Sequence, residues 1–194
     1  MLDKLIHIDT RLFLWLNSFH SPCRDSIMWH ISGKPEWIPL YLLLLGVIIY
    51  KYRWKSIAVI LAVSLTITLA DQLAVKAFKE VFMRLRPSHE PALEGLVHLV
   101  NDYRGGQYGF VSNHAANSFG LAVFISYLFK NKYVTTGMLV WACVVSYSRI
   151  YLGVHYPADI LGGALLGAGI ASFMYFLLVK ILWGSVFQKK VKRE

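Results

Sequence analysis

Long apolar runs separated by short polar segments dominate the pattern along this chain. Five runs have the character of helical membrane spans, and they cover about residues 36–50, 54–78, 113–129, 134–152 and 155–183. A spanning helix needs roughly 20 mostly apolar residues, so the first run is short. The last would rise about 43 Å at 1.5 Å per residue, enough to cross a bilayer with tilt. The pattern predicts an all-α fold, a polytopic helical membrane bundle.

The N-terminal segment has a different pattern. Between residues 3 and 19, apolar residues recur at helical intervals with charged residues among them, and a second short segment, 24–33, follows a Ser-Pro turn. Such an amphipathic pattern is typical of helices that lie in the membrane interface, which we expect for residues 1–33. If 12–33 crosses the bilayer instead, the chain has six spans; the sequence leaves five and six both open. We treat residues 1–194 as one membrane domain.

Composition supports the membrane assignment. The chain is 56% hydrophobic and 16% charged, with a mean hydropathy of +0.49, whereas soluble domains carry roughly 25% charged residues. The net charge of +9 comes largely from short basic clusters between the apolar runs. This arrangement is typical of cytoplasmic loops and does not favour a nucleic-acid partner.

The basic clusters also predict the orientation. Segments 51–55, 130–133 and 188–194 are basic, and they alternate correctly to share the cytoplasmic side. The 84–112 loop and the 152–156 turn then face outward. In the last span, small residues stand four apart at Gly163, Gly167 and Ala171, a spacing that lets helices pack closely in lipid. We interpret them as packing within one protomer rather than as a dimer interface, and the oligomeric state stays open.

Polar residues gather where the predicted spans meet the outer face. Four groups lie at successive span ends; they are Lys79 with Arg86, Ser112-Asn113-His114, Ser148-Arg149, and His155 with Asp159. Ionisable groups at membrane depth are costly, so their collection at one face indicates a functional site.

These side chains suit a phosphate ester. Lys79, Arg86 and Arg149 supply three cations, and guanidinium groups match phosphate oxygens bidentately. Two histidines can divide nucleophilic and proton-transfer roles, and Asp159, four residues after His155, lies one helical turn along the same face. No metal-ligand motif such as His-Glu-x-x-His occurs, so we expect no metal and no cofactor.

The motifs resemble those of the type 2 phosphatidic acid phosphatase family, which shares its core with vanadium haloperoxidases. The matching segments lie within 79–159, which we take as the catalytic region. They are Lys79-Glu-Val-Phe-Met-Arg-Leu-Arg86-Pro87, Ser112-Asn113-His114 and Ser148-Arg149-Ile-Tyr-Leu-Gly-Val-His155-Tyr-Pro-Ala-Asp159.

The resemblance implies a role for each matching residue. His155 would attack phosphorus and form a phosphohistidine, and Asp159 would hold its ring. His114 would protonate the leaving oxygen and then activate water. The phosphoryl oxygens would be bound by backbone N–H groups near 112–114 and by the side chains of Lys79, Arg86, Ser112, Asn113 and Arg149.

The second motif departs from the family pattern, which is usually Pro-Ser-Gly-His. Val111 replaces the proline, so the turn into the helix is less rigid, and Asn113 replaces the glycine. Asparagine tolerates unusual backbone angles better than most residues, and its amide is able to donate to phosphate. Within the second span, Asp71 is expected to form a structural ion pair with Lys76 or a buried hydrogen bond.

The resemblance implies a lipid phosphatase of a bacterial inner membrane, and the loop charges predict an active site on its periplasmic side. Its partner would be a phosphorylated membrane lipid: undecaprenyl diphosphate, a lipid A phosphate, phosphatidylglycerophosphate or phosphatidic acid. Resemblance favours the first two. Arg84 and Arg104 are further candidates for binding an anionic headgroup. Two alternatives stay open: a vanadate-dependent haloperoxidase, and a lipid-binding or transport protein that does not catalyse.

Overall fold

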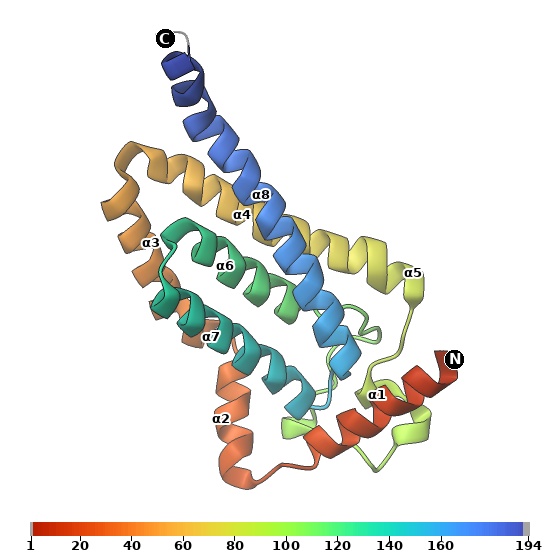
Figure 1. Ribbon diagram of the computed structural model, residues 1–194. Helices are drawn as coiled ribbons and strands as arrows, with labels where there is room; N and C mark the ends of the chain where they lie inside the picture. Colours follow the sequence, from red (N-terminus) through yellow and green to blue (C-terminus); the bar gives the residue numbers. More distant parts are fainter. Residues whose placement is uncertain (1, 192–194) are drawn as a thin grey trace.

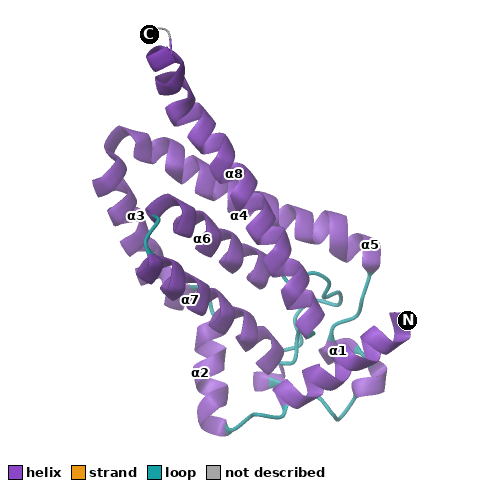
Figure 2. Cartoon of the chain, in the orientation of Figure 1, coloured by secondary structure: helices purple, strands orange, loops and turns teal. Residues whose placement is uncertain are grey.

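The computed structural model describes residues 2–191, with side chains from 3 to 181, and the described part is helical without strands (Figures 1 and 2). Its α-helices are α1 (Leu2–Asn17), α2 (Pro22–Ser32), α3 (Ile38–Tyr52), α4 (Ser56–Leu73), α5 (Glu80–Phe82), α6 (Asn113–Phe129), α7 (Lys132–Tyr151) and α8 (Pro157–Val191). A π-helical segment, Ala74–Lys79, joins α4 to α5, and short 3₁₀ turns lie at 35–37, 53–55, 87–89, 91–93 and 100–102. The all-α prediction is confirmed, and all five predicted runs form helices.

Helix α6 lies at the centre of the bundle and packs against α4, α7 and α8. Its first turn is capped by the Ser112 hydroxyl, which accepts from the Ala115 N–H. It ends at Phe129, and the next residue, Lys130, adopts a left-handed conformation (φ 50°) and donates its N–H to the Ser126 carbonyl oxygen. The following helix, α7, is capped by the Asn131 side chain. Local capping thus fixes the sharp α6–α7 turn.

Two continuous helical stretches of the described chain are long and apolar enough to cross a membrane, Pro35–Phe82 and Pro157–Ile181. The first contains a sharp bend at Arg53, where φ is 50°, and α3 and α4 extend from it as two arms (Figure 1). Helix α6 has 17 residues, a short length for a span. The number of crossings stays a prediction.

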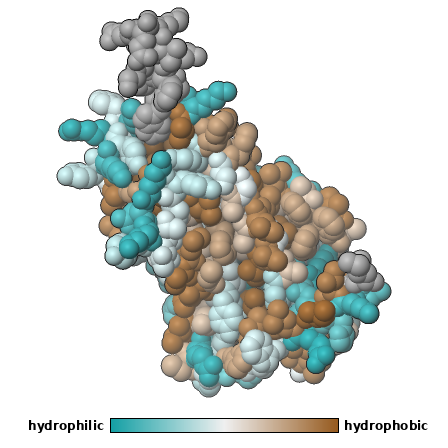
Figure 3. All heavy atoms as spheres, in the orientation of Figure 1, coloured by the Kyte–Doolittle hydropathy of each residue, from teal (hydrophilic) through white to brown (hydrophobic). Residues whose placement is uncertain are grey.

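The outer surface of the bundle is apolar. Figure 3 shows a broad hydrophobic region over the middle of the molecule and polar residues toward its ends. Large apolar side chains point outward from three helices, such as Leu43 of α3, Leu61 of α4 and Phe176 of α8, each more than half exposed. In water this surface would be unfavourable; in a bilayer it faces lipid.

Small residues bring α6 and α8 into close contact. A Cβ at Gly163 would lie 2.4 Å from the Ser112 carbonyl oxygen, and one at Gly167 would lie 2.0 Å from that of Ala116. Ala171, four residues further, is fully buried. The small residues predicted to pack a helix closely therefore do so within one chain.

Gly167→Ala is expected to destabilise the protein by about 1–3 kcal/mol, because backbone atoms of α6 would have to move away from the new methyl group. Gly169→Ala is the matched control, since nothing lies within 4 Å of a Cβ there. Thermal unfolding in detergent micelles measures both. Equal unfolding temperatures for the two variants would contradict the close packing.

Helices form in the N-terminal segment as predicted. Helix α1 exposes an apolar stripe that includes Leu5, Ile8, Leu12 and Trp15, while Phe13 is fully buried. The stripe has the spacing of an interfacial helix. The position of α1 and α2 in the membrane interface stays a prediction.

Candidate active site

The predicted site residues come from five segments that meet at one end of the bundle. Lys79 closes the π-helical segment, Arg86 lies in the loop after α5, and residues 112–114 open α6. Arg149 lies in the last turn of α7, and His155 and Asp159 flank the start of α8. A π-helical turn shifts the following side chains, and such turns are common at functional sites.

His155 and Asp159 form a buried pair. The histidine is 1% exposed and the carboxyl is fully buried. Asp159 Oδ2 lies 3.4 Å from His155 Nδ1 and accepts from the Tyr156 N–H at 2.9 Å. The loop preceding α6 closes over the pair, because a Cβ at Gly109 would lie 3.0 Å from Asp159 Oδ2 and 3.6 Å from His155 Nδ1. With Nδ1 directed at Asp159, Nε2 is the nitrogen that can act on a substrate.

Two buried guanidinium groups lie beside this histidine. Arg86 is 8% exposed and its Nε donates to the Tyr108 carbonyl oxygen at 3.1 Å. Arg149 is 4% exposed; its Nη1 donates to Ser32 Oγ and its Nη2 to Tyr103 Oη at 3.4 Å. Its Nε has no hydrogen-bond partner among the described residues.

None of Lys79, Arg86 and Arg149 pairs with a carboxylate in the part of the chain that the structure describes. Burial lowers the pKa of Arg86, and the charge of Arg149 lowers it further. An unpaired buried charge is unfavourable, so this pair of cations is stabilised when an anion binds between them.

The same surroundings keep His155 neutral. Burial lowers the pKa of His155 well below its ordinary value, and the charges of Arg86, Arg149 and Lys79 lower it further; a hydrogen bond to the Gly109 backbone opposes them. Protonation would add a fourth cation to a buried cluster. A neutral imidazole is the form that can act as a nucleophile.

The ring of His155 is therefore expected to stay neutral as the pH falls through about 6.5, where an ordinary histidine gains a proton. NMR titration of ¹³C-histidine-labelled protein in nanodiscs measures this, with His155→Asn used to assign the signal. A signal from His155 that titrates at or above pH 6.5 would contradict the electrostatic description.

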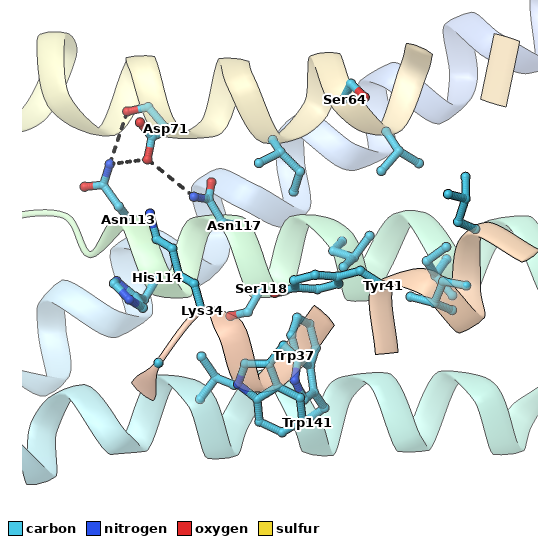
Figure 4. Close-up of a pocket in the computed structure, with 18 of the residues that line it drawn as sticks. Lys34, Trp37, Tyr41, Ser64, Asp71, Asn113, His114, Asn117, Ser118 and Trp141 are labelled. Atoms are coloured by element: carbon cyan, nitrogen blue, oxygen red, sulfur yellow. Dashed lines mark hydrogen bonds between the residues drawn. The ribbon is translucent and has the colours of Figure 1, made fainter. Parts of the chain in front are cut away.

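Ser112 and Asn113 lie at the site, and both form hydrogen bonds to other residues of the chain. Ser112 is fully buried, caps α6, and donates its backbone N–H to the Asp159 carbonyl oxygen at 3.0 Å. Asn113 Oδ1 accepts from Lys79. Its Nδ2 donates to Asp71 Oδ1 at 2.7 Å, as Figure 4 shows. The Asn113 amide nitrogen thus faces Asp71, while its oxygen holds the Lys79 ammonium group.

Asp71 forms buried hydrogen bonds, one of the two roles that we expected for it. It accepts from Asn113 and, at 3.3 Å, from Asn117 Nδ2 (Figure 4). The structure shows no ion pair between Asp71 and Lys76 among the described residues. The asparagine that replaces the family's glycine therefore connects an acid within α4 to a cation of the site.

His114 opens onto a cavity of about 620 Å³ between α3, α4, α6 and α7. Its walls are mostly apolar and include Leu44, Ile48 and Trp141, and Figure 4 shows Lys34, Asn113 and His114 at one end. Lys34 was not predicted as a site residue, because it lies outside every motif. A long apolar cavity that ends at a polar group suits a ligand with an apolar chain and a charged head.

Arg84 also occupies a position that the sequence did not predict. Its guanidinium group pairs with Asp159 at 3.0 Å and with Asp9 of α1 at 2.7 Å. Arg104, the other headgroup candidate, donates to the Ser88 carbonyl oxygen at 3.2 Å. In the described chain, no three His, Cys, Asp or Glu side chains form a group that could hold a metal ion.

Comparison with known proteins identifies the family. The profile of the PAP2 superfamily matches residues 57–183, which include all the motif residues. The chain belongs to the PAP2 superfamily. This confirms the resemblance seen in the three motifs and, with it, the classification of the chain as an integral-membrane lipid phosphatase.

The PAP2 relatives match over most of their length. Lipid A 4'-phosphatase of Bacteroides thetaiotaomicron is 41% identical over 93% of this chain and 81% of its own, and that of Porphyromonas gingivalis is 36% identical over 94% and 78%. A solved structure, the transmembrane PAP2 type phosphatidylglycerolphosphate phosphatase of Bacillus subtilis, is 24% identical with a TM-score of 0.65. It covers 98% of this chain and 89% of its own. It has the same fold.

Proposed function

We propose that this chain hydrolyses a phosphate monoester of lipid A, through a phosphohistidine at His155, on the extracytoplasmic side of the membrane. The observation that carries the proposal is the cluster of Lys79, Arg86 and Arg149, which has no carboxylate partner among the described residues and surrounds a buried histidine that Asp159 orients. A phosphoryl group supplies the missing negative charge and offers three oxygens to the three cations.

The proposed reaction has two steps. First, His155 Nε2 attacks phosphorus, the bond to the sugar oxygen breaks, and the leaving oxygen takes a proton from His114. In the second step, His114 removes a proton from water, which attacks the phosphohistidine and releases phosphate and free His155. Asp159 stabilises the positive charge that the His155 ring carries while phosphorylated.

The cavity supports a lipid substrate. It extends from His114 between apolar residues of α3, α4, α6 and α7, so an acyl chain bound there would leave the phosphate next to the cations. Lipid A is the proposed lipid because the relatives that are 41% and 36% identical to this chain carry the name lipid A 4'-phosphatase. Sequence resemblance alone favoured undecaprenyl diphosphate equally.

Phosphate release by the purified protein in lipid nanodiscs tests the substrate. Lipid A, undecaprenyl diphosphate, phosphatidylglycerophosphate and phosphatidic acid are offered separately with a chelator present, and mass spectrometry identifies the phosphate lost. We expect release from lipid A, with loss at the 4' position. Release from another lipid only would overturn the lipid A assignment, and lipid binding without turnover would support a non-catalytic protein.

The two natural cysteines help to test the orientation. Cys23 of α2 and Cys143 of α7 are both exposed on the protein surface, but Cys143 is in the middle of a predicted span. We expect an impermeant thiol reagent to label Cys23 in spheroplasts and not to label Cys143. In a Lys132→Cys variant, the new thiol should react only after lysis. Labelling of residue 132 in intact spheroplasts would reverse the proposed orientation.

A further inference from the structure

Arg84 occupies a position that the proposed chemistry does not use. Its Nη1 donates to Asp159 Oδ1 at 3.0 Å, and its Nη2 donates to Asp9 Oδ2 at 2.7 Å. The guanidinium carbon lies 4.0 Å from the centre of the Tyr156 ring. These contacts join three segments that are far apart in sequence: α1, the loop after α5 and the start of α8.

The other oxygen of Asp9 binds the start of α8. Asp9 Oδ1 accepts from the Ala158 N–H at 2.9 Å, in the first turn of the helix. A carboxylate at a helix N-terminus satisfies a free N–H group and interacts favourably with the helix dipole. Asp9 therefore fixes both Arg84 and the helix turn that carries Asp159.

Helix α1 is held firmly in this place by other contacts. Phe13 is fully buried and its ring centre lies 5.4 Å from that of Tyr156. Asn17 is 1% exposed, and its amide nitrogen donates to the carbonyl oxygens of Ile150 and Tyr151 at 3.2 and 2.8 Å. The docked helix thus presents Asp9 to Arg84 in one defined geometry.

The two oxygens of Asp159 have separate partners. Oδ2 faces His155 Nδ1 and the Tyr156 N–H, while Oδ1 faces Arg84. The Asp159 side chain is fully buried, so without Arg84 its negative charge would have no cationic partner among its hydrogen bonds. A carboxylate with a free oxygen can rotate or reorient, and the imidazole that it holds would then lose its alignment.

We propose that Asp9 and Arg84 are positioning residues for the reaction, and that α1 thereby completes the active site. They act through Asp159 on the orientation of His155 and do not contact the phosphoryl group. This inference rests on the proposed function, because it assumes that His155 and Asp159 carry the chemistry. It assigns the N-terminal helix to the catalytic unit, although the matched PAP2 region begins only at residue 57.

The substitutions Arg84→Gln and Asp9→Asn test the proposal. We expect kcat for phosphate release to fall on the order of 10- to 100-fold in each, with little change in KM, because alignment rather than substrate affinity is lost. Arg84→Lys retains the charge but not the planar fork, so it should restore part of the activity. Matched controls are Arg24→Gln in α2 and Asp3→Asn in α1, both exposed; these should retain wild-type kcat.

A double-mutant cycle shows whether Arg84 acts through Asp159. In an Asp159→Asn background, Arg84→Gln should cause no further loss of kcat; independent multiplication of the two losses would overturn the proposal. If Asp159→Asn itself retained wild-type activity, the proposed catalytic pair and this inference would both fall. If Asp159→Asn lowered kcat strongly and Arg84→Gln lowered it further by an independent factor, the catalytic pair would stand and only the positioning role of Arg84 would be refuted.

The ring signals of His155 give a second measurement that needs no turnover. ¹⁵N-histidine NMR of the resting protein in nanodiscs should show the His155 ring resonances shifted in Arg84→Gln and in Asp9→Asn, and unchanged in both control variants. Unchanged His155 signals in Arg84→Gln would show that Arg84 does not position the pair. A lowered unfolding temperature with unchanged kcat would mean a structural role only.

Discussion

His155→Ala is expected to abolish release of phosphate from lipid, with a loss of about 10⁴-fold or more in kcat, because the methyl side chain of alanine cannot form the covalent intermediate. His155 is 1% exposed and its Nδ1 faces Asp159, so Nε2 is the only ring nitrogen available to the substrate. The measurement is phosphate release in nanodiscs, on protein whose unfolding temperature has been checked.

Trapping the intermediate makes this prediction specific. Wild-type protein mixed rapidly with ³²P-labelled substrate should yield a phosphoenzyme that is stable in base and labile in acid, as phosphohistidine is. His155→Ala should yield none. His7→Ala is the matched control, since His7 is exposed on α1 and belongs to no motif. A labelled His155→Ala protein, or one with near-normal turnover, would refute the nucleophile assignment.

His114→Ala is expected to reduce kcat for lipid phosphate release by about 10²- to 10⁴-fold, the usual contribution of general acid–base catalysis. A sugar alkoxide is a poor leaving group without a proton. p-Nitrophenyl phosphate needs no such help, because p-nitrophenolate leaves unprotonated. With that substrate, the variant should form phosphohistidine quickly and hydrolyse it slowly, since His114 also activates the water.

The expected signature is therefore a burst of p-nitrophenolate, one equivalent per active site, followed by slow turnover with phosphoenzyme accumulated on His155. Stopped-flow absorbance measures the burst, and wild-type protein and His7→Ala provide the comparison. An equal loss of rate for both substrates, without a burst, would show that His114 supports the structure of the site and transfers no proton.

The proposed mechanism depends on the repulsion among the buried positive charges of the site. Arg86 and Arg149 repel one another in the free protein, and the protonated form of His155 is disfavoured by the same charges. When a phosphoryl group binds, its negative charge offsets this repulsion, and the stabilisation grows as charge develops in the transition state. Because Arg86 and Arg149 are already in position before the substrate binds, they need no reorganisation during the reaction.

Much of the architecture was predictable from sequence, because the physical signals are local. Apolar runs of span length and the helical periodicity of the N-terminal segment depend on neighbours within a few residues. The spacing of His155 and Asp159 also has a local meaning, since four residues make one helical turn. The helices and the grouping of the motif residues at one end followed from these patterns.

Contacts between distant segments could not be predicted in this way. Nothing near Arg84 in sequence indicates that it pairs with Asp9, 75 residues away, or with Asp159, 75 residues on. Likewise, the bond of Asn113 to Asp71 depends on how α6 packs against α4. From the sequence, Arg84 was one candidate for a headgroup contact and the Asn113 amide one candidate donor to phosphate, while in the structure both groups bind carboxylates of the protein.

The amino-acid sequence was enough to predict the membrane environment, the helical secondary structure and the class of chemistry, in which histidines and cations act on a phosphate ester. These depend on composition, periodicity and spacing, which are properties of the chain. Which charges form ion pairs and which remain available to a ligand became clear from the packing of the helices. The reason is that the free energy of a charge depends on burial and on its neighbours in space, and here most of those neighbours come from other helices.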